Sequence, residues 1–567
     1  MNDEKRLLLA IVLSVVVILG WNVLFMKPVQ QQSTRQGTSS TDRAAETASN
    51  RSADTEKLES RVRDFSADKS AGRAGQASGD FSPAENLRTV TVETPLYHIA
   101  ISEHDASVQS FTLKEYRESN AKSSDHKELV PSEAANGLFS TRFYNETVPE
   151  VNTASYTFSG SADRSAIETG SQNLTFTLET ESGVIVEKVF TFHADSYLID
   201  CDISVKNGSG RPVKDALAVY VPGFKEEGGS RMSHFAFEGP VALVNNELEE
   251  VDPDDIEEKD TFHGVIKWAG YTDRYFLSCV IPKNNGREAM VKLSKSGSGT
   301  KTGYVAPMDR LDPGKMTQYS FDFFMGPKSH KLLAGYNNSL QKAINFGWFD
   351  FLAKPLLIVM NYIHKLIPNY GVAILLLTVL IKIVFWPLGT KSYKSMNEMK
   401  KVQPLMQEIR EKYKDDKQKM NAEVMSLYKT YKVNPMSGCL PMLVQMPIFL
   451  ALYRMLYQAI ELRHAPFMLW IQDLSAPDRL FHFDFSIPFM QEPSGIPVLT
   501  IIMGASFLLQ QKMTPMSGDP TQAKIMMLMP IFMTVIFINF PAGLVLYIFA
   551  NNLISMGQQY YIQKKFS

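Results

Sequence analysis

The sequence has little cysteine and lacks the short motifs that mark several common enzyme classes. Its three cysteines, Cys201, Cys279 and Cys439, are spaced neither as a metal site nor as a redox pair. It has no G-x-x-x-x-G-K-S/T loop of nucleotide hydrolases, no H-E-x-x-H helix of zinc proteases and no G-x-S-x-G turn of serine hydrolases. We therefore expect a protein that is not an enzyme and that needs no cofactor. A disulfide between Cys201 and Cys279 remains open, although unpaired thiols are favoured.

The average composition conceals the difference between a polar half and an apolar half of the chain. A net charge of −2 is ordinary for a soluble protein, and 567 residues are too many for one ordinary domain. The polar half of the chain dilutes an apolar half. Many of the 27 methionines follow residue 390, where they suit either helix packing in lipid or a surface that accepts varied apolar partners.

The N-terminal segment reads as a membrane anchor with a tether behind it. Leu7–Met26 is an apolar run of 20 residues, which is long enough to cross a bilayer as a helix. It follows Lys5-Arg6 and ends in Phe25-Met26-Lys27-Pro28, a poor cleavage site for a signal peptide. We expect an uncleaved anchor at 1–27 with a cytoplasmic N-terminus. Residues 28–86 have almost no large apolar side chains, so we expect a flexible linker.

Residues 87–335 have the alternating pattern of β-strands. Apolar side chains recur at every second position in several short runs, namely 88–93, 97–101, 174–178, 184–192, 197–205 and 319–324. Turn residues such as Asn207-Gly208 and Ser209-Gly210 separate them. Many short alternating strands predict an antiparallel all-β sandwich. Because this region follows the first span, we place it outside the cytoplasm.

The C-terminal region predicts a membrane bundle. Residues 341–367 are aromatic-rich with charges on one side, which favours an amphipathic helix lying flat at the interface. Pro355 and five polar residues weigh against a span there. Within 368–567 we expect five further spans, six with the anchor, at 370–388, 441–462, 496–511, 525–540 and 543–562. Several are only 16 residues long, which suggests a thinned bilayer or incomplete crossing.

Charge sets the expected orientation. Residues 389–440 contain eleven Lys or Arg, whereas 463–495 contain two. An excess of Lys and Arg marks cytoplasmic loops. The bias places 389–440, 512–524 and the C-terminus inside.

The basic loop 389–440 is itself expected to be a helical hairpin. Apolar residues recur at intervals of three and four between Tyr393 and Tyr413 and again between Met420 and Tyr431. Residues 414–417 form the expected turn, and Asn434-Pro435 ends the second helix. The two stripes can simply bury each other, or the hairpin can act as a docking paddle whose basic face attracts anionic lipid or ribosomal RNA.

Lys382 is the most informative single residue. It lies among apolar residues of the span 370–388, where a charge is costly unless it faces water or a partner. Snorkelling to the interface is an equally good explanation, because Lys382 is only five residues from Pro387. Thr378 on the same face, Gln445 in the next span and the pair Asn551-Asn552 are also polar, so several helices could line one wet cavity.

A set of motifs gives the region a family resemblance. The run Pro441-Met-Leu-Val-Gln-Met-Pro-Ile-Phe-Leu-Ala-Leu-Tyr453 resembles the third span of the YidC family of membrane protein insertases. The match continues through the following segments, listed in chain order: Asn434-Pro435, Gly438-Cys439, Glu461-Leu-Arg463, Ala465-Pro-Phe467, Leu469-Trp-Ile471, Asp473-Leu-Ser475, Asp519-Pro520, Lys524-Ile-Met526, Met529-Pro530 and Phe540-Pro-Ala-Gly-Leu-Val-Leu-Tyr547. It covers about 340–565, with a weaker match through 324–328 and the anchor.

The resemblance implies a bacterial inner-membrane insertase and chaperone with a large periplasmic domain. It implies a hydrophilic groove closed to the outside, in which the family favours an Arg where this chain has Lys382. The groove residues carried over or placed beside it are Lys382, Thr378, Gln445, Tyr547 and Asn552. The expected cytoplasmic docking residues are Tyr393, Lys394, Lys400, Lys401 and Asp519. The implied partners are nascent membrane proteins, the ribosome, the Sec translocon and membrane lipids, with no small-molecule substrate.

Two alternatives remain at this stage. Lys382 could instead be the substrate or proton site of a small-molecule transporter, although the spans show no internal repeat. The β region could be a sugar-processing domain, because the family's domain resembles carbohydrate-binding sandwiches. The sequence identifies no convergent pair of carboxylates for such chemistry.

Overall fold

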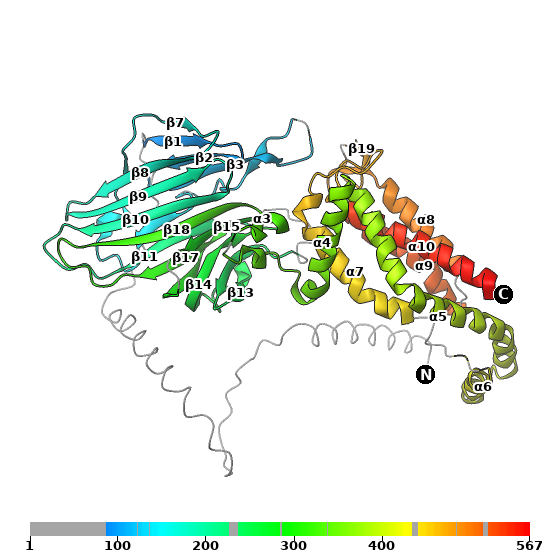
Figure 1. Cartoon of the computed structure of the whole chain (residues 1–567). Coiled ribbons are helices and arrows are strands. Elements are labelled where there is room, and N and C mark those ends of the chain that lie inside the picture. The colour runs from blue at the N-terminus through cyan, green and yellow to red at the C-terminus, as the bar shows by residue number, and fades with distance from the viewer. Residues whose placement is uncertain are drawn as a thin grey trace, which may run out of the picture. The chain divides into compact units, whose positions relative to one another are not determined.

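The computed structural model describes residues 87–567, apart from residues 122, 135, 226–235, 284–285, 337, 432, 434–439, 484, 514–519 and 567. Side chains are also left undescribed at 417, 440–444, 520–526 and 566. Strands β1 to β18 come first and the long helices follow, with only the short pair β19 and β20 between α7 and α8. The expected β-strand domain and helical C-terminal region are therefore confirmed (Figure 1). The expected anchor at 1–27 and linker at 28–86 lie outside the described residues, as does Asn434-Pro435.

The strands are β1 Thr89–Glu93, β2 Tyr97–Ser102, β3 Ser107–Arg117, β4 His126–Glu128, β5 Ser140–Phe143, β6 Thr157–Phe158, β7 Arg164–Ala166, β8 Ser171–Glu179, β9 Val184–His193, β10 Leu198–Asn207, β11 Ala216–Gly223, β12 Gly239–Val244, β13 Glu247–Glu250, β14 Thr261–Thr272, β15 Phe276–Pro282, β16 Glu288–Ser296, β17 Gly299–Pro307, β18 Met316–Pro327, β19 Leu480–Phe483 and β20 Ser494–Ile496.

The helices are α3 His330–Ala334, α4 Asp350–Leu366, α5 Tyr370–Lys412, α6 Lys417–Thr430, α7 Leu440–Gln458, α8 Val498–Met513, α9 Pro520–Phe537 and α10 Ala542–Phe566. Short 3₁₀ turns are η2 Pro149–Asn152, η4 Pro253–Asp255, η5 Leu340–Ala343, η6 Gly347–Phe349 and η8 Ile460–Leu462.

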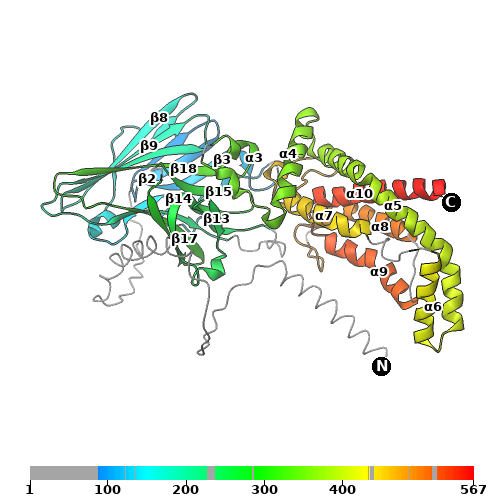
Figure 2. The ribbon, with the colours of Figure 1, turned by 60° about the horizontal axis from the view of Figure 1, so that its bottom comes forward.

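The β region contains two large sheets. One has the strand order β4-β3-β2-β1-β7, and the other runs β5-β11-β17-β16-β14-β15-β18-β10-β9-β8-β6, with β12 and β13 attached at β14. Figure 2 shows this region from a second side. Strand β14 joins the two halves of the larger sheet, because its first part pairs with β16 and its last part with β15. The neighbours are antiparallel except β1 and β7, which run parallel.

The alternation read from the sequence corresponds to burial. Strand β9 alternates buried and half-buried residues along its whole length, and the Phe190 and Phe192 side chains point into the core. Across the core Phe139 stacks on Phe323 with ring centroids 4.0 Å apart. Burying such rings supplies much of the free energy of folding, at about 25 cal/mol per Å² of apolar surface. Cys201 and Cys279 are both buried free thiols, as favoured from the sequence.

Six membrane spans are not confirmed. In the described part of the chain, α5 is the one helix both long and apolar enough to cross a bilayer. Helix α8 and residues Met527–Phe537 form shorter apolar helices. Large apolar side chains are nevertheless exposed on the bundle, including Ile383 at 66% and Phe532 at 60%, and such surfaces mark contact with lipid or protein.

One helix covers both the expected span at 370–388 and the first helix of the expected hairpin. Helix α5 continues through Pro387 and Pro404 to Lys412. A proline removes one backbone hydrogen bond and bends a helix without always ending it. The hairpin turn lies where it was predicted, because α6 begins at Lys417 with Asp416 accepting the Lys419 N–H.

The hairpin helices bury their stripes against each other. Met399 and Val402 of α5 form a small cluster with Val433, and Leu427 and Tyr428 pack against it. The Tyr428 hydroxyl also lies 3.2 Å from the sulfur of Met406. The apolar stripe is thus used inside the hairpin, and the charged side chains remain at the surface.

Helix α4 presents apolar residues on two sides. Ala353, Leu357 and Met360 lie at a helical spacing and are buried. Phe351 and Tyr362 are instead exposed, at 68% and 64%. A short helix with one packed face and exposed aromatic residues is typical of the membrane interface.

One arginine ties the β region to the helices. The Asp273 carboxylate accepts the N–H groups of Tyr275 and Phe276, each at 2.6 Å, and so fixes the turn between β14 and β15. From that turn Arg274 Nε donates to the Tyr457 carbonyl at 2.7 Å, and its guanidinium lies 3.7 Å from the Tyr457 ring centroid. Tyr457 is in the last turn of α7, where carbonyls lack helical partners and attract cations.

Replacing Arg274 should weaken this junction. Arg274→Ala removes a charge-assisted hydrogen bond and a cation–π contact, together worth about 1.5–3 kcal/mol. We expect the thermal unfolding midpoint of the purified protein to fall by a few degrees, on the scale of about 2–4 °C per kcal/mol for large domains. Arg287→Ala breaks an exposed ion pair with Asp309 and serves as the control. Equal midpoints for the two variants would contradict the role given to Arg274.

Candidate functional site

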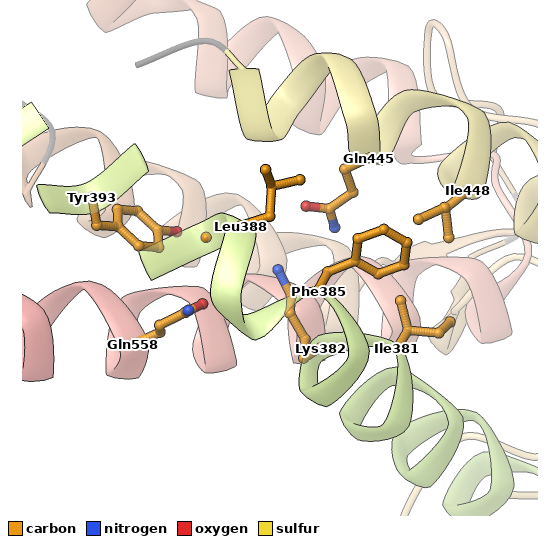
Figure 3. Close-up of a pocket in the computed structure, with 9 residues that line it drawn as sticks. Ile381, Lys382, Phe385, Leu388, Tyr393, Gln445, Ile448 and Gln558 are labelled. Carbon is orange, nitrogen blue, oxygen red and sulfur yellow. The ribbon is translucent and has the colours of Figure 1, made fainter. Parts of the chain in front are cut away.

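Three helices bring polar side chains together inside the bundle. A cavity of about 40 Å³ lies between α5, α7 and α10, lined by Ile381, Lys382, Phe385, Leu388, Gly389, Tyr393, Gln445, Ile448 and Gln558. Figure 3 shows the Lys382 amine and the Gln445 carboxamide pointing into the same space, beside the Phe385 ring. The volume accommodates a few waters.

Lys382 is held by α10. Its Nζ donates to Ser555 Oγ at 2.8 Å, and Ser555 Oγ in turn donates to the Asn551 carbonyl at 2.7 Å. The side chain is half-buried, and no Asp or Glu of the described residues lies within ion-pair distance of it. Lys382 therefore places an uncompensated positive charge at the edge of an apolar bundle, which is stable only where water or an anionic partner can reach it.

Gln445 joins α7 to the same helix. Its Nε2 donates to Asn551 Oδ1 at 2.5 Å. The Gln558 Nε2 reaches across to the Trp386 carbonyl of α5 at 3.1 Å. At Gly389 the helices approach so closely that a Cβ would lie 2.9 Å from the Gln558 amide nitrogen. Helix α10 is therefore bonded through side chains to both walls of the cavity.

The other three expected groove residues do not line this cavity. Thr378 is 1% exposed and donates to the Ile374 carbonyl of its own helix at 2.7 Å. Asn552 is buried and bonds Ser506 of α8 at 3.2 Å. Tyr547 is 2% exposed, and its ring packs near Phe449. The structure thus brings Lys382 and Gln445 together and places Thr378, Tyr547 and Asn552 in the packing around them.

The expected docking residues also divide into two groups. Lys394, Lys400 and Lys401 are exposed on the part of α5 that forms the hairpin. Tyr393 is half-buried and lines the cavity instead. Asp519 lies outside the described residues.

Ser555 and Gln558 were missed by the sequence reasoning. The signal was available, because Asn551, Asn552, Ser555, Gln558 and Gln559 are spaced at three and four residues along α10. That spacing puts polar side chains on one side of an otherwise apolar helix. Such a stripe predicts the helix that the other polar residues contact.

Comparisons with known proteins agree over nearly the whole chain. Residues 89–359 match the family described as the YidC periplasmic domain, and residues 362–567 match the family described as 60Kd inner membrane protein. A protein of Syntrophus aciditrophicus (strain SB) named membrane protein insertase YidC is 38% identical over 99% of this chain and 100% of its own length. A protein of the same name from Geobacter sulfurreducens is 38% identical over 100% of this chain and 99% of its own length.

Solved structures add fold likenesses. The crystal structure of an active YidC insertase with its first transmembrane domain resolved is 19% identical, covers 84% of this chain and 93% of that chain, and has a TM-score of 0.38. A galactose mutarotase related enzyme from Lactobacillus acidophilus is 11% identical and covers 42% of this chain and 97% of its own, with a TM-score of 0.31.

The relatives that share the full length of the chain are named as insertases, which is a non-enzymatic function in the inner membrane. On these matches, the chain belongs to the YidC family of membrane protein insertases.

Proposed function

We propose that the chain inserts nascent membrane proteins into the inner membrane and helps them fold, using the cavity around Lys382 to receive their polar flanks. The observation that carries this is the position of Lys382, a cation without a carboxylate partner among the described residues. It lies in a small cavity lined by both polar and apolar side chains, on a bundle with exposed apolar side chains. Polar segments gain a hydrated, charged site, and apolar segments remain beside lipid.

Electrostatics gives the site a preference. An acidic flank beside the Lys382 amine gains a favourable interaction that is strong at low dielectric and weak in water. Gln445 and Gln558 add amide groups that both donate and accept hydrogen bonds. The family that the sequence resembles favours Arg at this position. Lys keeps the positive charge but lacks the planar guanidinium that forms paired hydrogen bonds. Attraction of acidic flanks needs the charge alone.

Helix length supports a short crossing distance. Helix α8 has 16 residues and so spans about 24 Å at 1.5 Å per residue, which is less than the ~30 Å hydrocarbon core. A shorter apolar barrier lowers the cost of moving a polar flank across it. The apolar segment of the client then leaves sideways, driven by burial in lipid.

The domain arrangement completes the proposal. An anchor at 1–27, a linker at 28–86, a periplasmic sandwich at 87–335, an interfacial helix at 341–367 and a bundle of five further spans at 368–567 would place both termini in the cytoplasm. The two sheets over one aromatic core support the sandwich. The exposed Lys394, Lys400 and Lys401 on the hairpin suit contact with ribosomal RNA or anionic lipid. Work beside the Sec translocon is part of the same proposal.

A transporter site is less well supported. Pockets that enclose small molecules usually measure about 300–1,000 Å³. The cavity beside Lys382 measures about 40 Å³. A cavity of that size is too small to enclose a solute, whereas a polypeptide needs to place only a side chain or a few polar groups in it.

The charge of Lys382 should govern which clients are inserted. We expect Lys382→Ala to reduce insertion of a single-span client with an acidic flank about tenfold, equivalent to about 1.4 kcal/mol, and to affect a neutral flank less. Lys382→Arg should retain most activity and Lys382→Glu should lose most of it. The measurement is protease protection of the client in vesicles. Lys295→Ala removes an exposed charge of the β region, where Lys295 pairs with Glu257, and is the control. Equal losses for acidic and neutral flanks would refute the electrostatic explanation.

Crosslinking should trace the path of the client. With a ribosome-stalled single-span client, photoreactive probes at Phe385 and Gln445 should crosslink strongly, because both side chains line the open cavity. A probe at Thr378 should crosslink weakly, because that residue is buried against its own helix. Strong crosslinks from Thr378 with none from Gln445 would mean that clients pass elsewhere, and uptake of a solute without any crosslink would favour transport.

A further inference from the structure

A second and larger cavity lies between the β region and α7. It measures about 260 Å³ and is lined mainly by polar groups, among them Lys225, Glu250, Asp252, Asn345 and Arg454. None of these residues touches the cavity around Lys382. The lining combines two cations with several carboxylates, so it suits a ligand that carries both charges.

Arg454 provides the positive side. It projects from α7, and its Nη1 donates to the Phe346 carbonyl at 3.1 Å. Gly347 makes that approach possible, since it adopts a φ of +63° and an added Cβ would lie 2.5 Å from Arg454 Nη1. The Phe346 contact is the one hydrogen bond of this guanidinium to another described residue, so further N–H donors remain for a ligand.

Glu250 provides the negative side. Its Oε2 accepts a hydrogen bond from Asn345 Nδ2 at 2.9 Å. Burial raises the pKa of the Glu250 carboxyl, although the Asn345 bond and the charges of Lys328 and Arg454 oppose the rise. Within the described chain no Lys or Arg approaches it to ion-pair distance. A ligand ammonium in the cavity would compensate this carboxylate.

The cavity adjoins aromatic residues of the membrane interface. Trp348 follows Gly347 directly and Phe351 is four residues after Gly347, and each is 68% exposed. Exposed Trp and other aromatic residues concentrate at the level of lipid headgroups. In the proposed orientation, on which this step rests, Arg454 near the end of α7 faces the outer leaflet.

We propose that this cavity binds the zwitterionic headgroup of an aminophospholipid of the outer leaflet, with the phosphate on Arg454 and the primary ammonium on Glu250. Guanidinium binds phosphate oxygens through paired hydrogen bonds. A primary ammonium donates hydrogen bonds to carboxylates, whereas a trimethylammonium group has no N–H to donate. An anionic headgroup without an amine would leave the negative charges of Glu250 and Asp252 without a cation from the ligand. The order of preference is therefore phosphatidylethanolamine over phosphatidylcholine and phosphatidylglycerol.

The test uses the full-length protein in detergent micelles. Thermal unfolding is followed after adding phosphatidylethanolamine, phosphatidylcholine or phosphatidylglycerol with identical acyl chains, and in a separate arm after adding water-soluble phosphoethanolamine. We expect the ethanolamine lipid to raise the midpoint by several degrees and the other additives to raise it less. Native mass spectrometry should find the same lipid retained on the protein.

Two variants connect the effect to the cavity. Glu250→Gln keeps the shape and the acceptor for Asn345, and Arg454→Gln removes the guanidinium. Each should abolish the difference between the ethanolamine and choline lipids, measured against the same variant without lipid. Lys295 does not line the cavity and forms an exposed ion pair with Glu257. Lys295→Gln should therefore leave the difference between the ethanolamine and choline lipids unchanged.

Equal shifts for all lipids, or an ethanolamine effect that survives in Glu250→Gln, would overturn the proposal. If water-soluble phosphoethanolamine raised the unfolding midpoint as much as the lipid does, a membrane lipid would no longer be the identified ligand. These measurements use no client protein, so they can fail while insertion remains intact, and insertion can fail while the lipid binds.

Discussion

The helical region depends on one constraint, which is that polar side chains in an apolar bundle must find partners. Helix α10 meets that constraint for its neighbours. Its polar stripe bonds Lys382 of α5 through Ser555, Gln445 of α7 through Asn551, and Ser506 of α8 through Asn552. Each bond links a different helix to α10, and leaving a buried polar group without a partner costs about 1–3 kcal/mol. The packing of the bundle and the position of the cavity therefore follow from the same few hydrogen bonds.

The β region is joined to this bundle through backbone carbonyls as well as side chains. Arg274 bonds the carbonyl of Tyr457 at the end of α7, and Glu250 of β13 accepts a hydrogen bond from Asn345 just before α4. Nearby, the Lys328 amine donates to the Asp273 carbonyl at 2.5 Å and supports the turn that carries Arg274. Helix α7 also bears Gln445, so the helix bonded by Arg274 provides one wall of the cavity beside Lys382.

The sequence predicted elements better than it predicted their partners. Period-two alternation located β8, β9, β10 and β18, since burial on one face requires it. The order of the strands in the sheets was beyond prediction, because pairing such as that of β10 with β18 joins residues far apart in the chain. The sequence also did not show that the span and the first hairpin helix form one continuous helix, because hydropathy and helical periodicity do not reveal how two helical segments are joined.

The same distinction explains the site. Lys382 and Gln445 could be singled out because a polar group inside an apolar run is visible in sequence. Thr378 is equally visible in the sequence, yet its hydroxyl donates to the Ile374 carbonyl of its own helix, and Thr378 does not line the cavity. Thr378 and Lys382 lie on the same face of α5, so the two outcomes differ by side-chain length and by the partners within reach, which are the Ile374 carbonyl for Thr378 and Ser555 for Lys382.

The identity of the cation at position 382 follows from this geometry. A Lys amine needs few acceptors, and Ser555 supplies one within 2.8 Å while the remaining N–H groups stay available to water or a client. An Arg guanidinium would bring five donors in a rigid plane to a wall that offers amides and a hydroxyl. In the proposed mechanism the cavity acts through charge, which Lys supplies, and the paired recognition that Arg provides is not required where the client's acidic groups vary in position.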